Sequence, residues 1–427
     1  MRIQITLFLS VLLFTITACK DVVKKDQSVK EIPKMTAKEI LSNPEYLAIS
    51  YGGYRDTTRS VQPSLVQIKN DMKILAAMNI KILRTYNMQL PQATNVVKAI
   101  DQLKKEQPGF EMYVMLGAWI DCKNAWTGLE PDHHIESEQN AAEIDRAVTL
   151  AAQYPDIIKI IAVGNEAMVK WATSYYVQPN VILKWVNYLQ DLKKQDKLPA
   201  DLWITSSDNF ASWGGGEDLY HVPALNKLIK AVDYISMHTY PMHDTHYNPV
   251  FWGTAEKDSL LNKEQKIENA MKRSLGYAQD QYSRVKKYMK SVGVDKPVHI
   301  GETGWATYSS GLYGDDGSHA ADQYKSGRYY QLMREWTTKN KISCFYFEAF
   351  NEKWKDAANP KGSENHFGLF NIDGEAKYAV WDLVDQGVFN GLTRNGNKIT
   401  KSFNGSKKKL LEYVKLPPVK QNFKGYE

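Results

Sequence analysis

The sequence contains few cysteines, which excludes the classes of protein that depend on them. Only Cys19, Cys122 and Cys344 occur in 427 residues, so a disulfide scaffold is excluded. No Cys or His spacing typical of a metal site is present, and the adjacent His133 and His134 fit a loop better than a ligand pair. We therefore expect neither a metal nor another cofactor.

A strong excess of one charge is also missing. The 54 Lys and Arg residues exceed the 48 Asp and Glu residues by only 6, and the lysines are scattered along the chain. No stretch interleaves basic clusters with stacking aromatic rings, as a nucleic-acid platform would. The composition therefore argues against a nucleic-acid partner.

Long hydrophobic runs are absent apart from the one at the start, which is too short to span a membrane. One positive charge and an apolar run precede Cys19, and the segment Ile16–Cys19 resembles a bacterial lipobox. We predict a signal peptide over residues 1–18, lipidation of Cys19 and a Lys-rich tether over residues 19–43. The protein is then anchored in the cell envelope through lipid. The alternative is a plain signal peptide with a chance cysteine.

Short apolar runs alternate with amphipathic stretches between residues 44 and 385, which predicts an α/β fold. The runs lack polar alternation, as strands buried on both faces do. The eight expected strands are Leu47–Tyr51, Ile80–Tyr86, Glu111–Trp119, Ile157–Gly164, Leu202–Ser207, Val232–His238, Val298–Gly301 and Ile342–Glu348.

Eight strands that are each followed by a helical stretch predict one (β/α)8 TIM barrel with loop insertions. Helical spacing is clear, for example, over Leu65–Met78, Ala141–Gln153, Val181–Leu192, Lys266–Val292 and Ala320–Lys339. A doubly wound open sheet is the alternative, but the Gly214–Gly216 run lacks the following helix of a phosphate turn. Residues 386–427 are predicted to pack on the barrel as an extension. In such a barrel Cys122 and Cys344 lie at opposite ends, too far apart to bridge.

Two acidic residues follow apolar strands that a barrel places across its mouth from each other. Glu166 ends the fourth strand and Glu302 ends the seventh. Breaking an acetal needs one protonated carboxyl group to supply the leaving oxygen with its proton and one ionised carboxylate. A spacing of about 5–5.5 Å means retention, and one of roughly 6.5–9.5 Å means inversion. The pair predicts a glycoside hydrolase.

An ordered set of motifs around these acids resembles glycoside hydrolase family 17, the retaining β-1,3-glucanases and related glucan transferases. The motifs are Tyr51–Asp56, Ile82–Tyr86, Val163–Glu166, His238–Pro241, Gly301–Trp305, Phe350–Lys355 and Asn365–Phe370. By this resemblance Glu166 is the acid/base, set in less polar surroundings, and Glu302 is the nucleophile. Asn165 holds the sugar 2-hydroxyl, and Tyr240 donates to Glu302.

The resemblance also implies that β-glucan is the substrate and partner. The other expected sugar-binding residues are Tyr51, Arg84, Tyr86, Trp119, Trp305, Glu352 and Lys355. Tyrosine and tryptophan are abundant, at 25 and 11 residues, and rings such as these bury the C–H faces of pyranoses. Glu352 and Lys355 have an alternative role as a salt bridge that braces the last loop. More distant candidates for sugar contact are Trp126, Trp171, Trp213 and Trp252.

Three functions stay open at this point. The first is hydrolysis of laminarin-like β-1,3-glucan, and the second is transfer of the glucan to another sugar through the same covalent intermediate. The third is non-catalytic glucan binding at the cell surface, which the presence of both acids disfavours. We expect a monomer.

Overall fold

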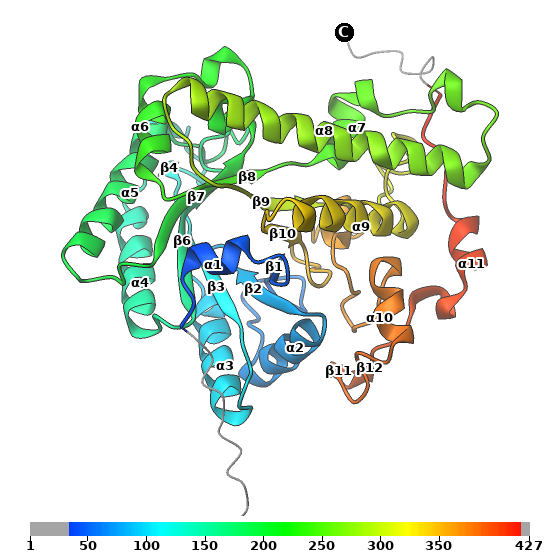
Figure 1. The fold of residues 1–427 in the computed structure, drawn as a ribbon, viewed down its shortest axis with the longest axis horizontal. Helices are drawn as coiled ribbons and strands as arrows, with labels where there is room; N and C mark the ends of the chain where they lie inside the picture. The colour runs from blue at the N-terminus through cyan, green and yellow to red at the C-terminus, as the bar shows by residue number, and fades with distance from the viewer. Residues whose placement is uncertain (1–33, 420–427) are drawn as a thin grey trace, which may run out of the picture.

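The computed structural model describes residues 34–419, and its centre is a closed barrel of eight parallel strands (Figure 1). Each strand pairs with the next along the chain, and the last pairs with the first. The barrel strands are β1 (Leu47–Ser50), β2 (Ile80–Arg84), β3 (Tyr113–Ala118), β6 (Ile158–Asn165), β7 (Trp203–Asn209), β8 (Ile235–His238), β9 (Val298–Gly304) and β10 (Cys344–Phe347). The predicted (β/α)8 fold is confirmed.

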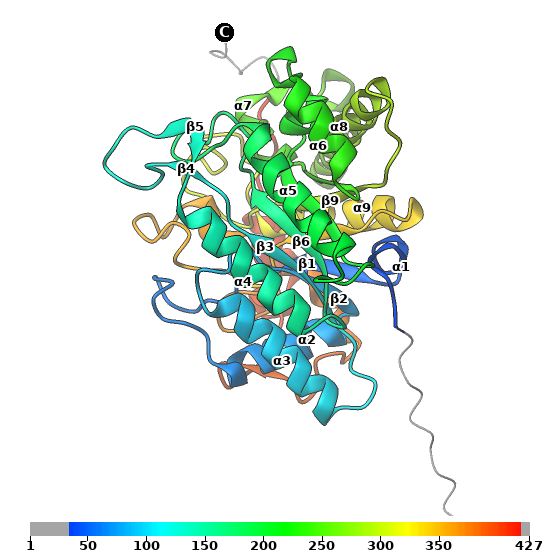
Figure 2. The ribbon, with the colours of Figure 1, turned by 90° about the vertical axis from the view of Figure 1, so that its left-hand side faces the viewer.

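Helices surround the barrel, and Figure 2 shows three of them, α3, α4 and α5, side by side on one flank. Their first residues carry ordinary start signals: Ser64 and Asn262 cap α2 and α8 through capping boxes, and proline opens α5 and α6. The main helices are α2 (Leu65–Ala77), α3 (Gln92–Glu106), α4 (Gln139–Gln153), α5 (Pro179–Lys194), α6 (Pro223–Ala231), α8 (Lys263–Ser291) and α9 (Gln323–Lys339).

Residues 37–42 correct the prediction that a tether runs to residue 43. They form helix α1 (Ala37–Ser42), whose first turn is closed by a capping box between Thr36 and Glu39. Ile40 and Leu41 are buried in one cluster with Ala48 of β1. The helix therefore closes the amino-terminal end of the barrel. The signal peptide, Cys19 and tether residues 20–33 lie outside the described residues.

The extension after residue 385 contains a small hairpin, β11 (Thr393–Arg394) with β12 (Asn397–Lys398), and helix α11 (Lys407–Glu412). The hairpin lies beside α2 (Figure 1), where the buried Arg394 Nε donates to Asp71 Oδ1 at 3.1 Å. Residues 420–427 of the predicted extension lie outside the described residues.

Two insertions enlarge the carboxyl end of the barrel. A hairpin of β4 (Cys122–Lys123) and β5 (Asp132–Glu136) lies between β3 and α4, and α7 (Pro241–Tyr247) follows β8. Cys122 and Cys344 are buried free thiols, as predicted. Among residues 34–419 no helix combines the length and the apolar character that crossing a membrane requires.

Candidate active site

The two predicted acids lie at the carboxyl end of the barrel and are linked by residues of neighbouring strands. Glu166 follows β6, and its backbone N–H donates to Ser207 O of β7 at 3.0 Å. Glu302 lies in β9, opposite His238 of β8 in the strand register. The glycine before Glu302 allows this close packing, because a Cβ at Gly301 would lie 2.1 Å from Ser236 Oγ.

Glu302 is a buried carboxylate that receives three hydrogen bonds from side chains. Tyr240 donates to Oε1 at 2.6 Å, while Tyr86 and Arg84 Nη1 each donate to Oε2 at 2.7 Å. Burial alone would raise the pKa of Glu302, but attraction by His238 and Arg84 and the two tyrosine hydrogen bonds lower it below its ordinary value. Glu302 is therefore held ionised, and the predicted bond from Tyr240 is confirmed.

Glu166 has a different environment. Its side chain is 26 % exposed against 9 % for Glu302, so it is not the more buried of the two acids. Its Oε1 lies 3.1 Å from His238 Nδ1, and its backbone adopts a left-handed φ of 46°. What distinguishes the two acids is the number of donors around each, because Glu302 has two tyrosines and an arginine and Glu166 has this imidazole.

Asp208 holds the backbone next to Glu166. It is fully buried at the end of β7, and its Oδ2 accepts from the backbone N–H of Met168 at 2.7 Å. Burial raises its pKa to about 7, and the negative potential of Glu166 acts in the same direction. The sequence analysis did not include Asp208 in the site, although this residue directly follows the predicted strand Leu202–Ser207.

Arg84 and His238 connect the two acids into one network. Arg84 Nη1 lies 3.1 Å from His238 Nε2, while Arg84 Nη2 donates to Asn165 Oδ1 at 2.5 Å. His238 Nε2 is also 2.8 Å from Ser207 Oγ. Arg84 is 1 % exposed, so it orients Glu302 and Asn165. The prediction that Arg84 contacts sugar is therefore wrong. His238 was absent from the predicted site; only its position at a strand end could have indicated it.

Lys355 and a set of aromatic rings surround the Glu302 side of this network. The Lys355 ammonium lies 4.3 Å from the Phe347 ring centre, and the same ring makes edge contacts with Tyr86 and Tyr240. The nearby carboxylates of Glu348 and Glu352, at 3.5 and 3.8 Å, hold Lys355 in position. The positive charge therefore lies near Glu302, and the ion pairs with Glu348 and Glu352 agree with the predicted bracing role of Lys355.

Burial corrects several predicted sugar contacts. The rings of Tyr51 and Trp305 are 1 % and 0 % exposed, because Tyr51 donates to Asp71 and the Trp305 indole donates to Ala320 O. Glu352 is 1 % exposed and accepts from Tyr54 N and Trp354 Nε1, so its role is the bracing one. The predicted contacts of these three residues with sugar are wrong.

The remaining aromatic candidates for sugar contact also divide into buried and exposed residues. Trp213 and Trp252 are buried, whereas Trp126 and Trp171 are 63 % and 58 % exposed, and Trp119 is partly exposed. Sequence alone could not separate them, since each tryptophan follows a barrel strand within a loop.

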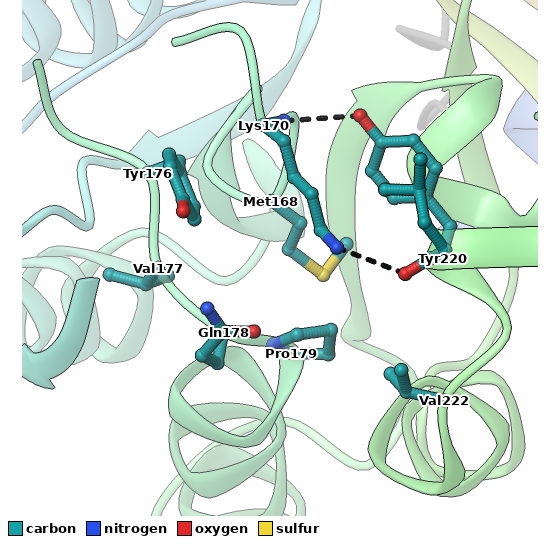
Figure 3. A pocket seen from close by; sticks show the side chains of 9 residues that line it. Met168, Lys170, Tyr176, Val177, Gln178, Pro179, Tyr220 and Val222 are labelled. Atoms are coloured by element: carbon teal, nitrogen blue, oxygen red, sulfur yellow. Dashed lines mark hydrogen bonds between the residues drawn. The ribbon is translucent and has the colours of Figure 1, made fainter. Parts of the chain in front are cut away.

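A small cavity is lined by residues of the segment that follows Glu166, among them Met168 and Lys170, and by Tyr220 and Val222 (Figure 3). Lys170 crosses it, and its ammonium donates to Leu219 O while its backbone N–H donates to the Tyr220 hydroxyl. The cavity measures about 20 Å³, which accommodates a water molecule and not a sugar ring. Within residues 34–419 no group of His, Cys, Asp and Glu could hold a metal ion, and His133 is stacked on Tyr176.

Comparison with known proteins gives a family match and a close structural one. The model of the BtgE/BtgC glycoside hydrolase domain matches residues 48–368. The solved structure of an endo-laminarinase from Formosa Hel1_33_131 is 62 % identical, covers 92 % of this chain and all of its own, and superposes with a TM-score of 0.90.

More distant relatives are fungal. A putative glucan endo-1,3-β-glucosidase btgC of Aspergillus niger is 23 % identical over 71 % of this chain, and its counterpart in Emericella nidulans is 22 % identical over the same share. The chain spans 37 % and 39 % of the lengths of these curated relatives. A family 17 β-1,3-glucanosyltransferase of Rhizomucor miehei, at 18 % identity and a TM-score of 0.54, covers 78 % of this chain and 96 % of its own and shares the fold.

Proposed function

The chain belongs to the BtgE/BtgC glycoside hydrolase domain family, and from that premise we propose that it cleaves internal β-1,3-glucosidic bonds of laminarin-like glucans. It is a glycoside hydrolase, and the substrate proposal rests on one observation above the others. The endo-laminarinase that it resembles is 62 % identical over that protein's whole length. The fungal relatives named as endo-1,3-β-glucosidases support the same linkage.

In the proposed reaction Glu302 is the nucleophile. Its lowered pKa keeps it ionised, and attack on the anomeric carbon forms a glycosyl ester while the bond from that carbon to the leaving oxygen breaks. The tyrosines on either oxygen, Tyr86 and Tyr240, hold the carboxylate in one orientation. Water then cleaves the ester, and two displacements return the original configuration.

Glu166 is the proposed acid/base. It gives its proton to the leaving oxygen in the first step and takes one from the attacking water in the second. Asn165 is proposed to hold the sugar 2-hydroxyl. Its carbonyl oxygen accepts a hydrogen bond from Arg84, which leaves the amide nitrogen to donate to the sugar. The 2-hydroxyl bond strengthens as charge develops on the ring. With these roles, the chain is proposed to be a retaining hydrolase of family 17.

The test is release of reducing ends from linear β-1,3-glucan by the purified protein. Glu302→Gln and Glu166→Gln are each expected to lower kcat by roughly a thousandfold or more, since each removes a group that acts on the reacting atoms. Glu335→Gln, at an exposed position of α9, is the matched control and should leave kcat unchanged. Full activity in Glu302→Gln would refute the proposal, and chains longer than the substrate would identify a transferase.

Anchoring at Cys19 is a separate proposal that rests on the sequence. The apolar run and Ile16–Cys19 resemble a lipoprotein signal, so the mature protein is proposed to be held in the cell envelope by acyl chains on Cys19. Labelled palmitate should be incorporated into the wild-type protein and not into Cys19→Ala. A wild-type protein that takes up no label would contradict the anchor.

A further inference from the structure

Three aromatic side chains near Glu166 form a surface that the proposed catalytic steps do not use. Trp119 follows β3, Trp126 lies between β4 and β5, and Tyr175 lies in the segment after Glu166. The Trp126 and Tyr175 rings are stacked, with centres 5.0 Å apart and planes 22° apart, and Trp119 is 5.2 Å from Tyr175. We call these three residues the aromatic shelf.

Trp126 is exposed and yet held in one position. Its residue surface is 63 % exposed, while one ring face covers Tyr175. The Trp119 indole Nε1 donates to Asp121 at 3.3 Å, and Trp126 acts to lower the pKa of the same carboxyl group. The Trp126 backbone adopts a left-handed φ of 60°, which costs energy in a residue other than glycine. A large aromatic ring that is held in place on a strained backbone and is open to solvent is typical of a binding surface.

The hairpin that carries Trp126 is fastened to the segment after Glu166. It projects from the barrel in Figure 2, and Cys122 N donates to Tyr175 O at 3.1 Å. His133 stacks on Tyr176 with ring centres 3.6 Å apart, and Glu136 accepts from the Trp185 indole at 2.6 Å. The β4–β5 hairpin and the segment after Glu166 therefore hold the aromatic shelf in a fixed position, and no movement is needed for it to contact a ligand.

The shelf lies on the Glu166 side of the acid pair. Val177 N, in the segment that carries Tyr175, donates to the carbonyl oxygen of Ala167, next to Glu166, at 2.7 Å. Trp119 follows β3, which pairs with β6, the strand that Glu166 follows. The pKa of the Tyr175 phenol, raised first by burial and then by Glu166, agrees with this placement. Tyr86 and Tyr240, whose rings contact Glu302, lie just after the ends of β2 and β8. A sugar on the shelf would approach the bond from the side of the proton donor.

We propose that the aromatic shelf binds the glucose units on the leaving-group side of the cleaved bond, and that Trp126 is a specificity-determining residue for long β-1,3-glucan chains. This rests on the proposed function, in which Glu166 protonates the departing oxygen. The glucose unit that carries the departing oxygen must lie on the Glu166 side of the cleaved bond. There the solvent-exposed face of Trp126 can pack against the C–H face of a pyranose. The hairpin thereby selects substrates that extend beyond the scission point.

Two substrates separate this proposal from a general role of Trp126. Laminarihexaose places sugars on both sides of the cleaved bond, whereas β-laminaritriosyl fluoride has fluoride as its leaving group and places none on the shelf. We expect Trp126→Ala to lower kcat/KM for laminarihexaose about tenfold, from the loss of apolar contact, and to leave hydrolysis of the fluoride unchanged. Trp126→Phe should restore part of the loss.

Tyr413→Ala is the matched control, because this ring is also exposed and lies in the carboxyl-terminal extension. Equal losses on both substrates, or no loss with laminarihexaose, would overturn the proposal. If the wild-type protein cleaves neither substrate, the proposed function fails instead. Calorimetric binding of laminarihexaose to Glu302→Gln, with and without Trp126→Ala, then still decides: weaker binding in the double variant supports the shelf, and equal binding refutes it.

Discussion

At the scale of single residues, Glu302 is a buried acid whose two carboxylate oxygens are both occupied by side-chain donors. Tyr240, Tyr86 and Arg84 together satisfy both carboxylate oxygens. A buried carboxylate without such partners would be protonated at neutral pH. The acid therefore depends on three side chains at the ends of two other strands, β2 and β8, which no local stretch of sequence contains.

Removing the Tyr240 hydroxyl should move the acidic limb of the pH profile. The hydrogen bond from Tyr240 lowers the pKa of Glu302, so Tyr240→Phe should raise that pKa and shift the acidic limb of kcat/KM to higher pH. The loss of one hydrogen bond to a charged group should also lower kcat/KM by about tenfold or more. Tyr413→Phe is the control; an unshifted acidic limb in Tyr240→Phe would contradict the assigned contact.

Asp208 should make stability depend on pH with a known sign. Its pKa is about 7 in the folded protein and about 3.9 when unfolded, so the native state holds the extra proton between these values. This contribution is present below about pH 4 and is lost as the pH rises to about 7. Asp208→Asn should remove that slope, measured by urea unfolding from pH 4 to 8, and should be more stable relative to wild type at pH 8 than at pH 4. Parallel curves would contradict the burial argument.

At the scale of elements, α1 shows what a short amphipathic segment contributes. Ile40 is fully buried against the amino-terminal end of the barrel, far from the acids at the other end. Ile40→Ala should lower the free energy of unfolding by about 2–4 kcal/mol through the cavity it leaves, without changing kcat/KM. Lys38→Ala, at an exposed position of the same helix, is the control. A stability equal to that of Lys38→Ala would show that α1 does not close the barrel.

The elements that the sequence predicted best were those with continuous apolar runs. All eight barrel strands overlap their predicted ranges, because strands covered by helices leave no polar alternation to confuse the pattern. Helix α1 was missed because the Lys-rich composition around it outweighed a single capping box, Thr36 with Glu39. The β4–β5 hairpin has strands too short and too exposed to produce a period.

The residues of the site also divide into those that the sequence could predict and those that it could not. Glu166, Glu302 and Tyr240 were predictable because strand ends meet at one rim of a barrel. The roles of Tyr51 and Trp305 were not, since a ring that follows a strand can point to the rim or into the helix layer. Burial decides between these, and burial depends on distant residues such as Asp71 and Ala320.

At the scale of the whole molecule, Arg394 connects the last part of the chain to an early helix. It donates to Asp71 of α2, which also pairs with Arg55 at 2.9 Å. Arg394→Met should lower the free energy of unfolding by about 3 kcal/mol, because it removes one partner of a buried ion pair. Lys398→Met, on the exposed β12, should have little effect. Equal stabilities of the two variants would show that the extension does not brace the barrel.

Labelling with a slow substrate tests the central claim most directly. A 2-deoxy-2-fluoro-laminaribiosyl fluoride forms the glycosyl ester faster than water can cleave it, so the intermediate accumulates and can be digested and sequenced by mass spectrometry. We predict that the sugar is attached to the peptide that carries Glu302, with configuration retained on release. Attachment to Glu166, Glu348 or Glu352, or turnover without any covalent adduct, would contradict the account.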